Sequence, residues 1–271
     1  MLIIAIAGIT YRIDHNTIFD LSIRQEFDER APRLFGGGTA SSSTYQSDSF
    51  VGSVADGGSC NVSTLRVAPH LHGTHTECAG HITRSRVAVC DAVPDVLVAA
   101  TLVSVHPERA ISVRDEWSGS TQADDHIVTE QVLRAALERR RPGFADALIV
   151  RTRPNRIEKK AADYDLRGAP YLSTAAMGFI CDLGVRHLVL DLPSADRLDD
   201  GGELLCHHAF FQVSTGGDDG SRVRTDRTIT ELAYIDEAVS DGIYLLNLQV
   251  PPFATDAAPS RPLLLPVSVA G

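Results

Sequence analysis

The sequence predicts a mixed α/β fold with a large sheet, folded as a single domain over residues 1–271. Three observations lead to this prediction. Short apolar runs rich in β-branched residues recur along the chain, helical periodicity is confined to two segments, and no internal repeat or linker interrupts the pattern. A chain of 271 residues is also long enough to bury a full-sized core.

Six apolar runs are the predicted strands. Each is short, and turn or loop residues flank several of them, which is the pattern of strands buried in a sheet. The runs are residues 2–9, 96–105, 147–152, 187–192, 243–250 and 262–269.

Two segments have the apolar periodicity and end signals of helices. Thr129 is placed to cap a helix that reaches Arg139 and carries an apolar stripe. Ser173 is placed to cap a second helix, with Gly184 at its C′ position. Two polar stretches, residues 36–48 and 214–227, are predicted to be solvated loops, and a role as lids near a site stays open for both.

Charge and composition exclude several classes of partner. The formal net charge is −10, which disfavours nucleic acid and anionic membrane surfaces, because both reward clustered Lys and Arg. The one basic cluster, Arg139-Arg140-Arg141, ends a predicted helix, where it opposes the helix dipole. The apolar run at residues 2–9 is too short to span a bilayer and does not resemble a signal peptide.

The five cysteines favour a reducing compartment. They are scattered, odd in number and contain no C-x-x-C pair, so neither a disulfide framework nor a cysteine-rich zinc site is expected. The sequence therefore predicts a cytoplasmic protein.

A dense histidine cluster is the main chemical signal. Four of the ten histidines lie between residues 70 and 81, together with Glu77. In an extended chain alternate side chains share a face, so His70 would point with His72, and His75 with Glu77. Gly73 lets the backbone turn between the two pairs. Imidazole and carboxylate are the usual ligands of Zn²⁺ and suit Mn²⁺ or Fe²⁺, so this cluster predicts a metal site with a position open to water.

Residues 73–81, GTHTECAGH, resemble the H-x-G-T-H-x-D-x-P-x-H signature of the cyclase family of metal-dependent hydrolases, which includes bacterial kynurenine formamidase and isatin hydrolase. The resemblance extends along most of the chain in the expected order. The further matching segments are residues 20–23 (DLSI), 188–196 (LVLDLPSAD), 206–211 (CHHAFF) and 228–232 (TITEL).

The resemblance implies a swivelling β/β/α fold of the kynurenine formamidase type, a homo-oligomer (dimer or tetramer), and hydrolysis of an amide, formamide or lactam bond in a small molecule. It implies one or two divalent cations per chain, with Zn²⁺ expected first and Mn²⁺ as the alternative. The implied metal ligands are His70, His75, Glu77, His207 and Glu231, and His81 takes the position of the general acid/base.

Three departures from the family pattern bear on these assignments. The family's first histidine falls on Leu71, so His70 or His72 must replace it; His70 is favoured, with His72 as its hydrogen-bonding partner. Glu77 replaces an Asp, which bears on bridging between two metals. The chain between His207 and Glu231 is longer than in the formamidases, so formylkynurenine is not assumed as the substrate.

Two other functions remain open at this point. A lyase or cyclase would use the same metal to stabilise an enolate or alkoxide, and a non-catalytic metal-binding protein would fill every coordination position itself. A bound metal lowers the pKa of its water to roughly 7 and polarises a carbonyl, so hydrolysis is the first expectation. Cys78 is interpreted as a packing residue rather than a nucleophile, because the local histidines are better employed on metal.

Several polar residues outside the cluster have weaker signals. Asp191, Ser194 and Asp196 follow a predicted strand, where turn-forming residues are common, so a structural role is weighted slightly above a role in the site. His126 and His187 have no other ligand-type residues around them and are expected to be ordinary.

Overall fold

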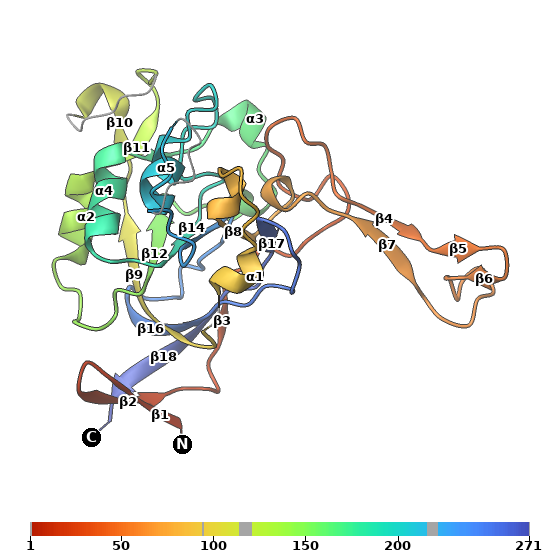
Figure 1. The fold of residues 1–271 in the computed structure, drawn as a ribbon, viewed down its shortest axis with the longest axis horizontal. Coiled ribbons are helices and arrows are strands. Elements are labelled where there is room, and N and C mark those ends of the chain that lie inside the picture. Colours follow the sequence, from red (N-terminus) through yellow and green to blue (C-terminus); the bar gives the residue numbers. More distant parts are fainter. Residues whose placement is uncertain (1, 94, 114–120, 216–221, 271) are drawn as a thin grey trace.

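One large sheet organises the computed structural model, which describes residues 2–93, 95–113, 121–215 and 222–270 (Figure 1). The sheet has eleven strands, and its four central strands run parallel while the outer ones pair antiparallel. Its order is β1 (Leu2–Ile6), β2 (Ile9–Ile13), β18 (Leu263–Val269), β16 (Gly242–Asn247), β9 (Val98–Val105), β12 (Ala147–Thr152), β14 (His187–Leu190), β15 (Thr228–Glu231), β8 (His75–Cys78) and β17 (Ala257–Pro259), with β3 (Phe19–Asp20) on β18.

Helices cover one face of this sheet. The longest are α2 (Glu130–Leu137) and α4 (Thr174–Asp182), and α5 (Leu205–Phe211) packs on α4. Two shorter helices, α1 (Val89–Ala92) and α3 (Tyr164–Arg167), and the 3₁₀ turns η1 (Pro69–Leu71), η2 (Ala79–His81), η3 (Ala110–Ser112) and η4 (Ile157–Ala161) lie in the connections. A small sheet joins β10 (Glu108–Arg109), β11 (His126–Val128) and β13 (Tyr171–Leu172).

The parallel strands are buried on both faces, because successive side chains enter two different cores. Leu148 and Val150 of β12 pack into the core under the helices. Ala147 and Ile149 of the same strand pack into a second core that includes Leu21. Burial on both faces explains why these strands are nearly continuous apolar runs in the sequence.

Both predicted helices form where their caps indicated. The hydroxyl oxygen of Thr129 accepts a hydrogen bond from the backbone N–H of Val132, at the start of α2. The Ser173 hydroxyl accepts from the N–H of Ala176 at 3.0 Å, and Gly184 has φ +78° just beyond α4. The mixed α/β, sheet-rich fold class is confirmed, with strands at five of the six predicted runs.

The remaining run, the first along the chain, is corrected by the structure. Residues 2–9 do not form one strand, because the chain turns at Ala7 and Gly8, which have φ +48° and +77°. The run is therefore split between β1 and β2, which pair as an antiparallel hairpin. Two consecutive residues with positive φ are the mark of a tight hairpin turn, which the apolar character of the run hid.

A second correction concerns residues 41–48, which were expected to be a loop. Ser41–Thr44 forms β4 and pairs with β7 (Ser63–Arg66), while β5 (Gln46–Ser47) pairs with β6 (Phe50–Val51). We call residues 41–66 the arm, because it projects from the body of the molecule (Figure 1). Of the other expected loop, 214–227, residues 216–221 lie outside the described part of the chain.

Candidate metal centre

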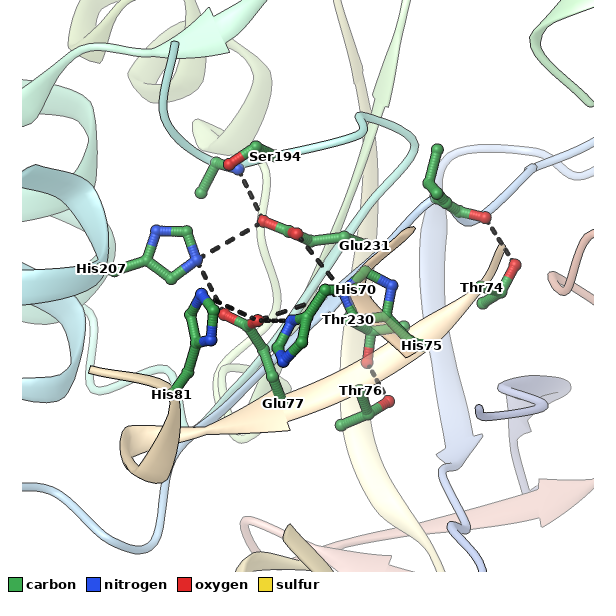
Figure 2. Close-up of polar contacts among 12 residues, drawn as sticks. His70, Thr74, His75, Thr76, Glu77, His81, Ser194, His207, Thr230 and Glu231 are labelled. Atoms are coloured by element: carbon green, nitrogen blue, oxygen red, sulfur yellow. Dashed lines mark hydrogen bonds and ion pairs between the residues drawn. The ribbon is translucent and has the colours of Figure 1, made fainter. Parts of the chain in front are cut away.

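The antiparallel strands β8 and β15 bring His75, Glu77 and Glu231 together. The register of β8 and β15 sets His75 directly opposite Glu231, and Glu77 opposite Ile229. His75 and Glu77 are two residues apart on a strand, so they share a face as predicted, with His75 Nε2 4.0 Å from Glu77 Oε2 and 3.5 Å from Glu231 Oε2 (Figure 2). All four residues of β8 are buried.

His70 enters the same site from the 3₁₀ turn η1. Its Nδ1 lies 2.9 Å from Glu77 Oε2, and its ring stacks on that of His81 with centroids 4.1 Å apart. The expectation that His70 and His72 point together is wrong, because a 3₁₀ turn has three residues per revolution and separates positions i and i+2. His72 turns away, and its Nδ1 accepts a hydrogen bond from the backbone N–H of Ala68.

His207 comes from the first turns of α5, on the opposite side of Glu77. Its Nε2 lies 2.7 Å from Glu77 Oε1 and 3.7 Å from Glu231 Oε1. Its Nδ1 donates to Asp196 Oδ2 at 2.5 Å, and the same carboxylate accepts from the backbone N–H of Cys206 at 2.7 Å. Asp196 therefore holds both the start of α5 and the ring of His207.

The three imidazoles share one arrangement. In each ring one nitrogen donates outward: His70 Nε2 to Asp256 Oδ2 at 2.8 Å, His75 Nδ1 to the Gly73 carbonyl at 3.0 Å, and His207 Nδ1 to Asp196. The other nitrogen of each ring faces Glu77 or Glu231 (Figure 2). Metal-ligating histidines almost always have this arrangement, because the outer hydrogen bond fixes the tautomer and leaves the inner lone pair free.

The inward-facing atoms also suit a cation, because several of them lack a hydrogen-bond partner. Within the described part of the chain, His75 Nε2 and both carboxylate oxygens of Glu77 are buried without a partner in hydrogen-bonding geometry, although imidazole nitrogens approach Glu77 closely. Buried polar atoms are costly when unpartnered. Ligand atoms of His70, Glu77 and His81 lie within 4.8 Å of one another, and so do those of His75, Glu77 and Glu231.

The electrostatics of the site favour positive charge. Burial lowers the pKa of His70, but the carboxylates of Glu77 and Asp256 outweigh it and raise the pKa to about 9. Burial likewise opposes protonation of His207, yet Glu77 and Asp196 hold its pKa well above its usual value. Burial raises the pKa of Glu77, but His207 and His70 reverse this and bring it well below the ordinary range.

His81 differs from the other three rings. Its Nε2 is 4.0 Å from Glu77 Oε2 and its Nδ1 is 3.5 Å from Asp256 Oδ2, so it lies at the rim of the cluster with 27% of its side chain exposed. Burial is the largest influence on its pKa and lowers it, which favours the neutral ring. A neutral imidazole beside the site is suited to accept a proton.

Two carboxylates of this site were not assigned to it from the sequence. Asp196 was weighted toward a structural role, whereas the structure places it on His207. Asp256 was not singled out at all, because it follows β16 in a loop without a motif and meets His70 only through the fold. The contacts of the other two residues are structural: Asp191 accepts from Thr152 and Lys159, and the Ser194 hydroxyl accepts from the backbone N–H of Asp196.

The remaining candidates have ordinary surroundings. Cys78 is buried, its Sγ contacts the Val87 carbonyl, and burial raises the pKa of its thiol to about 11, which agrees with a packing role. His187 is buried against the Thr228 hydroxyl, and His126 is exposed on β11. A cavity of about 560 Å³ is lined by Asp256, Gly80 and residues 83–88, and by none of the proposed ligands.

Comparisons with known proteins agree with this geometry. The chain is 26% identical over 213 residues to the kynurenine formamidase of Bacillus anthracis, which covers 78% of this chain and 83% of the relative. An isatin hydrolase bound to thioisatinate superposes with a TM-score of 0.62 at 13% identity, covering 93% of this chain and 92% of the other. A predicted metal-dependent hydrolase from Bacillus stearothermophilus gives a TM-score of 0.59 at 16% identity, with 92% and 98% covered.

The helices that the structure describes include none long and apolar enough to cross a bilayer. The names of these three relatives denote hydrolases, in agreement with the prediction of a metal-dependent hydrolase. The family model described as "Putative cyclase" matches residues 9–197, more than half of the chain. The protein therefore belongs to the Cyclase family.

Proposed function

We propose that the protein is a metal-dependent hydrolase that cleaves the C–N bond of an amide, formamide or lactam. One observation carries the proposal: three outward-anchored imidazoles and two carboxylates converge, and His75 Nε2 and both Glu77 oxygens lack partners in hydrogen-bonding geometry among the described residues. The proposed ligands are His70, His75, Glu77, His207 and Glu231. Nitrogen and oxygen donors without thiolates suit Zn²⁺ first and Mn²⁺ second.

Glu77 is central to the number of cations. Its oxygens belong to both groups of converging ligand atoms, one with His70 and His81 and the other with His75 and Glu231. A carboxylate has two oxygens and can serve two cations. The site therefore supports one cation or two, with Glu77 as the shared ligand in the second case.

A cation held by these residues would supply Lewis acidity to a carbonyl and would make water nucleophilic near neutral pH. The protein's own contribution to proton transfer falls to His81. Its neutral ring is free to take a proton from the attacking water and to return it to the leaving nitrogen. Asp196 and the Gly73 carbonyl hold two of the ligating rings in place meanwhile.

The class of substrate rests on the relatives. Kynurenine formamidase is named for a formamide bond, and isatin hydrolase for a cyclic amide substrate. We therefore propose a small acylated amine or lactam as the substrate.

Metal analysis and isotope labelling test this proposal. Protein purified without a histidine tag is expected to hold stoichiometric Zn²⁺ or Mn²⁺, to lose activity in chelator, and to regain it with metal. Formamides, lactams and amides are then incubated in ¹⁸O-labelled water. Label in the carboxylate product supports hydrolysis, whereas turnover without label favours the lyase or cyclase reaction. Full activity in metal-free protein refutes the mechanism.

We further propose that the chain acts as a homo-oligomer in a reducing cytoplasm. The arm supports the oligomer, since Tyr45, Val54 and Leu65 are exposed on a hairpin that projects from the body (Figure 1). An isolated hairpin is marginally stable in water, so packing against a second copy would stabilise it. Light scattering should give a dimer or tetramer, and Leu65→Asp should shift it toward monomer. All five cysteines are unpaired, which suits the proposed compartment.

A further inference from the structure

His70 is anchored differently from the other two proposed ligand rings. His75 is fixed by a backbone carbonyl two residues away, and His207 by the buried carboxylate of Asp196. His70 lies on a single 3₁₀ turn with 27% of its side chain exposed, and its outward partner is a side chain 186 residues away, Asp256. The orientation of this ring therefore depends on a long-range contact.

The backbone positions Asp256 tightly. Strand β17 pairs with β8 so that Ala257 lies opposite Glu77, and the carbonyl of Asp256 accepts from the N–H of Cys78 at 3.0 Å. On the other side the chain at Gly80 approaches so closely that an added Cβ would lie 3.1 Å from the Cβ of Asp256 and 2.3 Å from the Val87 carbonyl oxygen. The backbone therefore fixes the position of the Asp256 Cβ beside His70.

We infer that Asp256 is a positioning residue that orients the His70 imidazole for metal binding. The 2.8 Å contact assigns the proton of the outer nitrogen to Nε2, because a carboxylate only accepts. Nδ1 is then the nitrogen that faces Glu77, at 2.9 Å. His75 and His207 instead present Nε2 to the acids. Turning the His70 ring over would carry its inward nitrogen away from Glu77.

The expected change in metal affinity rests on the proposed function, whereas the orientation of His70 by Asp256 does not. Loss of an outer hydrogen bond to a ligating histidine commonly lowers metal affinity roughly 10–100-fold. We expect a fall of this size in Asp256→Ala, measured by competition with a chromophoric chelator for Zn²⁺. Asp256→Asn retains an oxygen that accepts from Nε2, so its loss should be smaller. Asp91→Asn is the matched control, because Asp91 is an exposed acid on the same cavity.

A nuclear magnetic resonance measurement separates this inference from the proposed function. In metal-free wild-type protein the Nε2 proton of His70 should be protected from exchange, and His70→Gln assigns its signal. The signal should persist in Asp256→Asn and disappear in Asp256→Ala. In ¹¹³Cd-loaded protein, cadmium should couple to Nδ1 of His70 and to Nε2 of His75 and His207.

The outcomes are distinct. Equal protection of the His70 proton in wild type and Asp256→Ala overturns the inference, even if the enzyme is a metal hydrolase. Cadmium coupled to Nε2 of His70, or an Asp256→Asn loss as large as that of Asp256→Ala, also overturns it. A wild-type protein that binds no metal refutes the proposed function, while the exchange measurement still decides whether Asp256 orients His70.

Discussion

Two four-residue strands of this protein, β8 and β4, have opposite environments. Both pair antiparallel along most of their length, yet every residue of β8 is buried and every residue of β4 is exposed. Strand β8 lies between β15 and β17 in the main sheet, whereas β4 pairs only with β7 in the arm. Polar residues therefore have different consequences in the two strands, because a polar group that is withdrawn from water must find its partner inside the protein.

The largest effect is expected at Glu77, the acid at the centre of β8. Glu77→Gln should bring metal content to background and lower activity by more than roughly the 100-fold that loss of an outer hydrogen bond costs. Metal-free protein should also lose about 3–5 kcal/mol of unfolding free energy, because His70 and His207 lose their buried counter-charge. Metal analysis and chemical denaturation measure the two effects.

Asp48→Asn provides the matched change in the arm, where the acid is exposed. Metal content, activity and stability should stay at wild-type values. If Glu77→Gln retained its metal, Glu77 would not be a ligand, and the contrast between the two regions would concern stability alone.

The next largest effect is expected at His81, which follows β8 at the rim of the site. His81→Ala should keep its metal and fold while kcat falls about 10²–10⁴-fold, the usual contribution of general acid/base catalysis. The base must be neutral to accept a proton, so the wild-type rate should fall as pH drops through the pKa of His81, which burial places below 6.5. The variant should lose this acidic limb of the pH–rate profile.

Metal retention is the control for His81→Ala. A variant that turns over at the wild-type rate contradicts the acid/base role, and one that loses its metal makes His81 a ligand. His126→Ala changes an exposed imidazole on β11 and should leave both quantities unchanged.

His187 extends the comparison to a buried imidazole outside the site. Burial lowers its pKa from 6.5 to about 4, so the unfolded chain binds a proton more readily than the folded one. The stabilisation is fully present above pH 6.5 and is lost as pH falls toward 4, on the order of 3 kcal/mol in total. The variant His187→Asn, which can still bond to Thr228, should flatten the unfolding free energy over this window.

The same substitution at exposed His126 is the control for this window. His126→Asn should leave the pH dependence as in wild type. Equal slopes in wild type and His187→Asn would show that the buried ring does not change its protonation on unfolding.

The smallest effects are expected from the same substitution, Thr→Val, made once in β8 and once in the arm. Thr76 of β8 shares its hydroxyl with those of Thr230 and Ser260, at 2.7 and 2.8 Å. Thr76→Val leaves these partners unsatisfied and should cost about 1–3 kcal/mol of unfolding free energy. Thr64→Val on the exposed strand β7 should stay within about 0.5 kcal/mol. Equal losses would mean that the arm is as buried as β8, as an oligomer could make it.

Local pattern was sufficient for much of the fold. The two helix caps, five strands and the shared face of His75 and Glu77 follow from interactions within a few residues, which sequence spacing records directly. The hairpin turn at Ala7 and the strands of the arm were missed. An apolar run conceals a turn, and polar strands that face solvent lack the alternation that marks a buried face.

The sequence by itself determined the chemistry of the site, because the dense cluster of imidazoles beside Glu77 has few explanations other than metal. Only the tertiary structure decided which atoms meet. It set His70 rather than His72 against Glu77, and it brought Asp196 and Asp256 onto the rings of His207 and His70. These contacts join strands and loops whose proximity depends on sheet order and register, and neither quantity is recorded in the spacing of nearby residues.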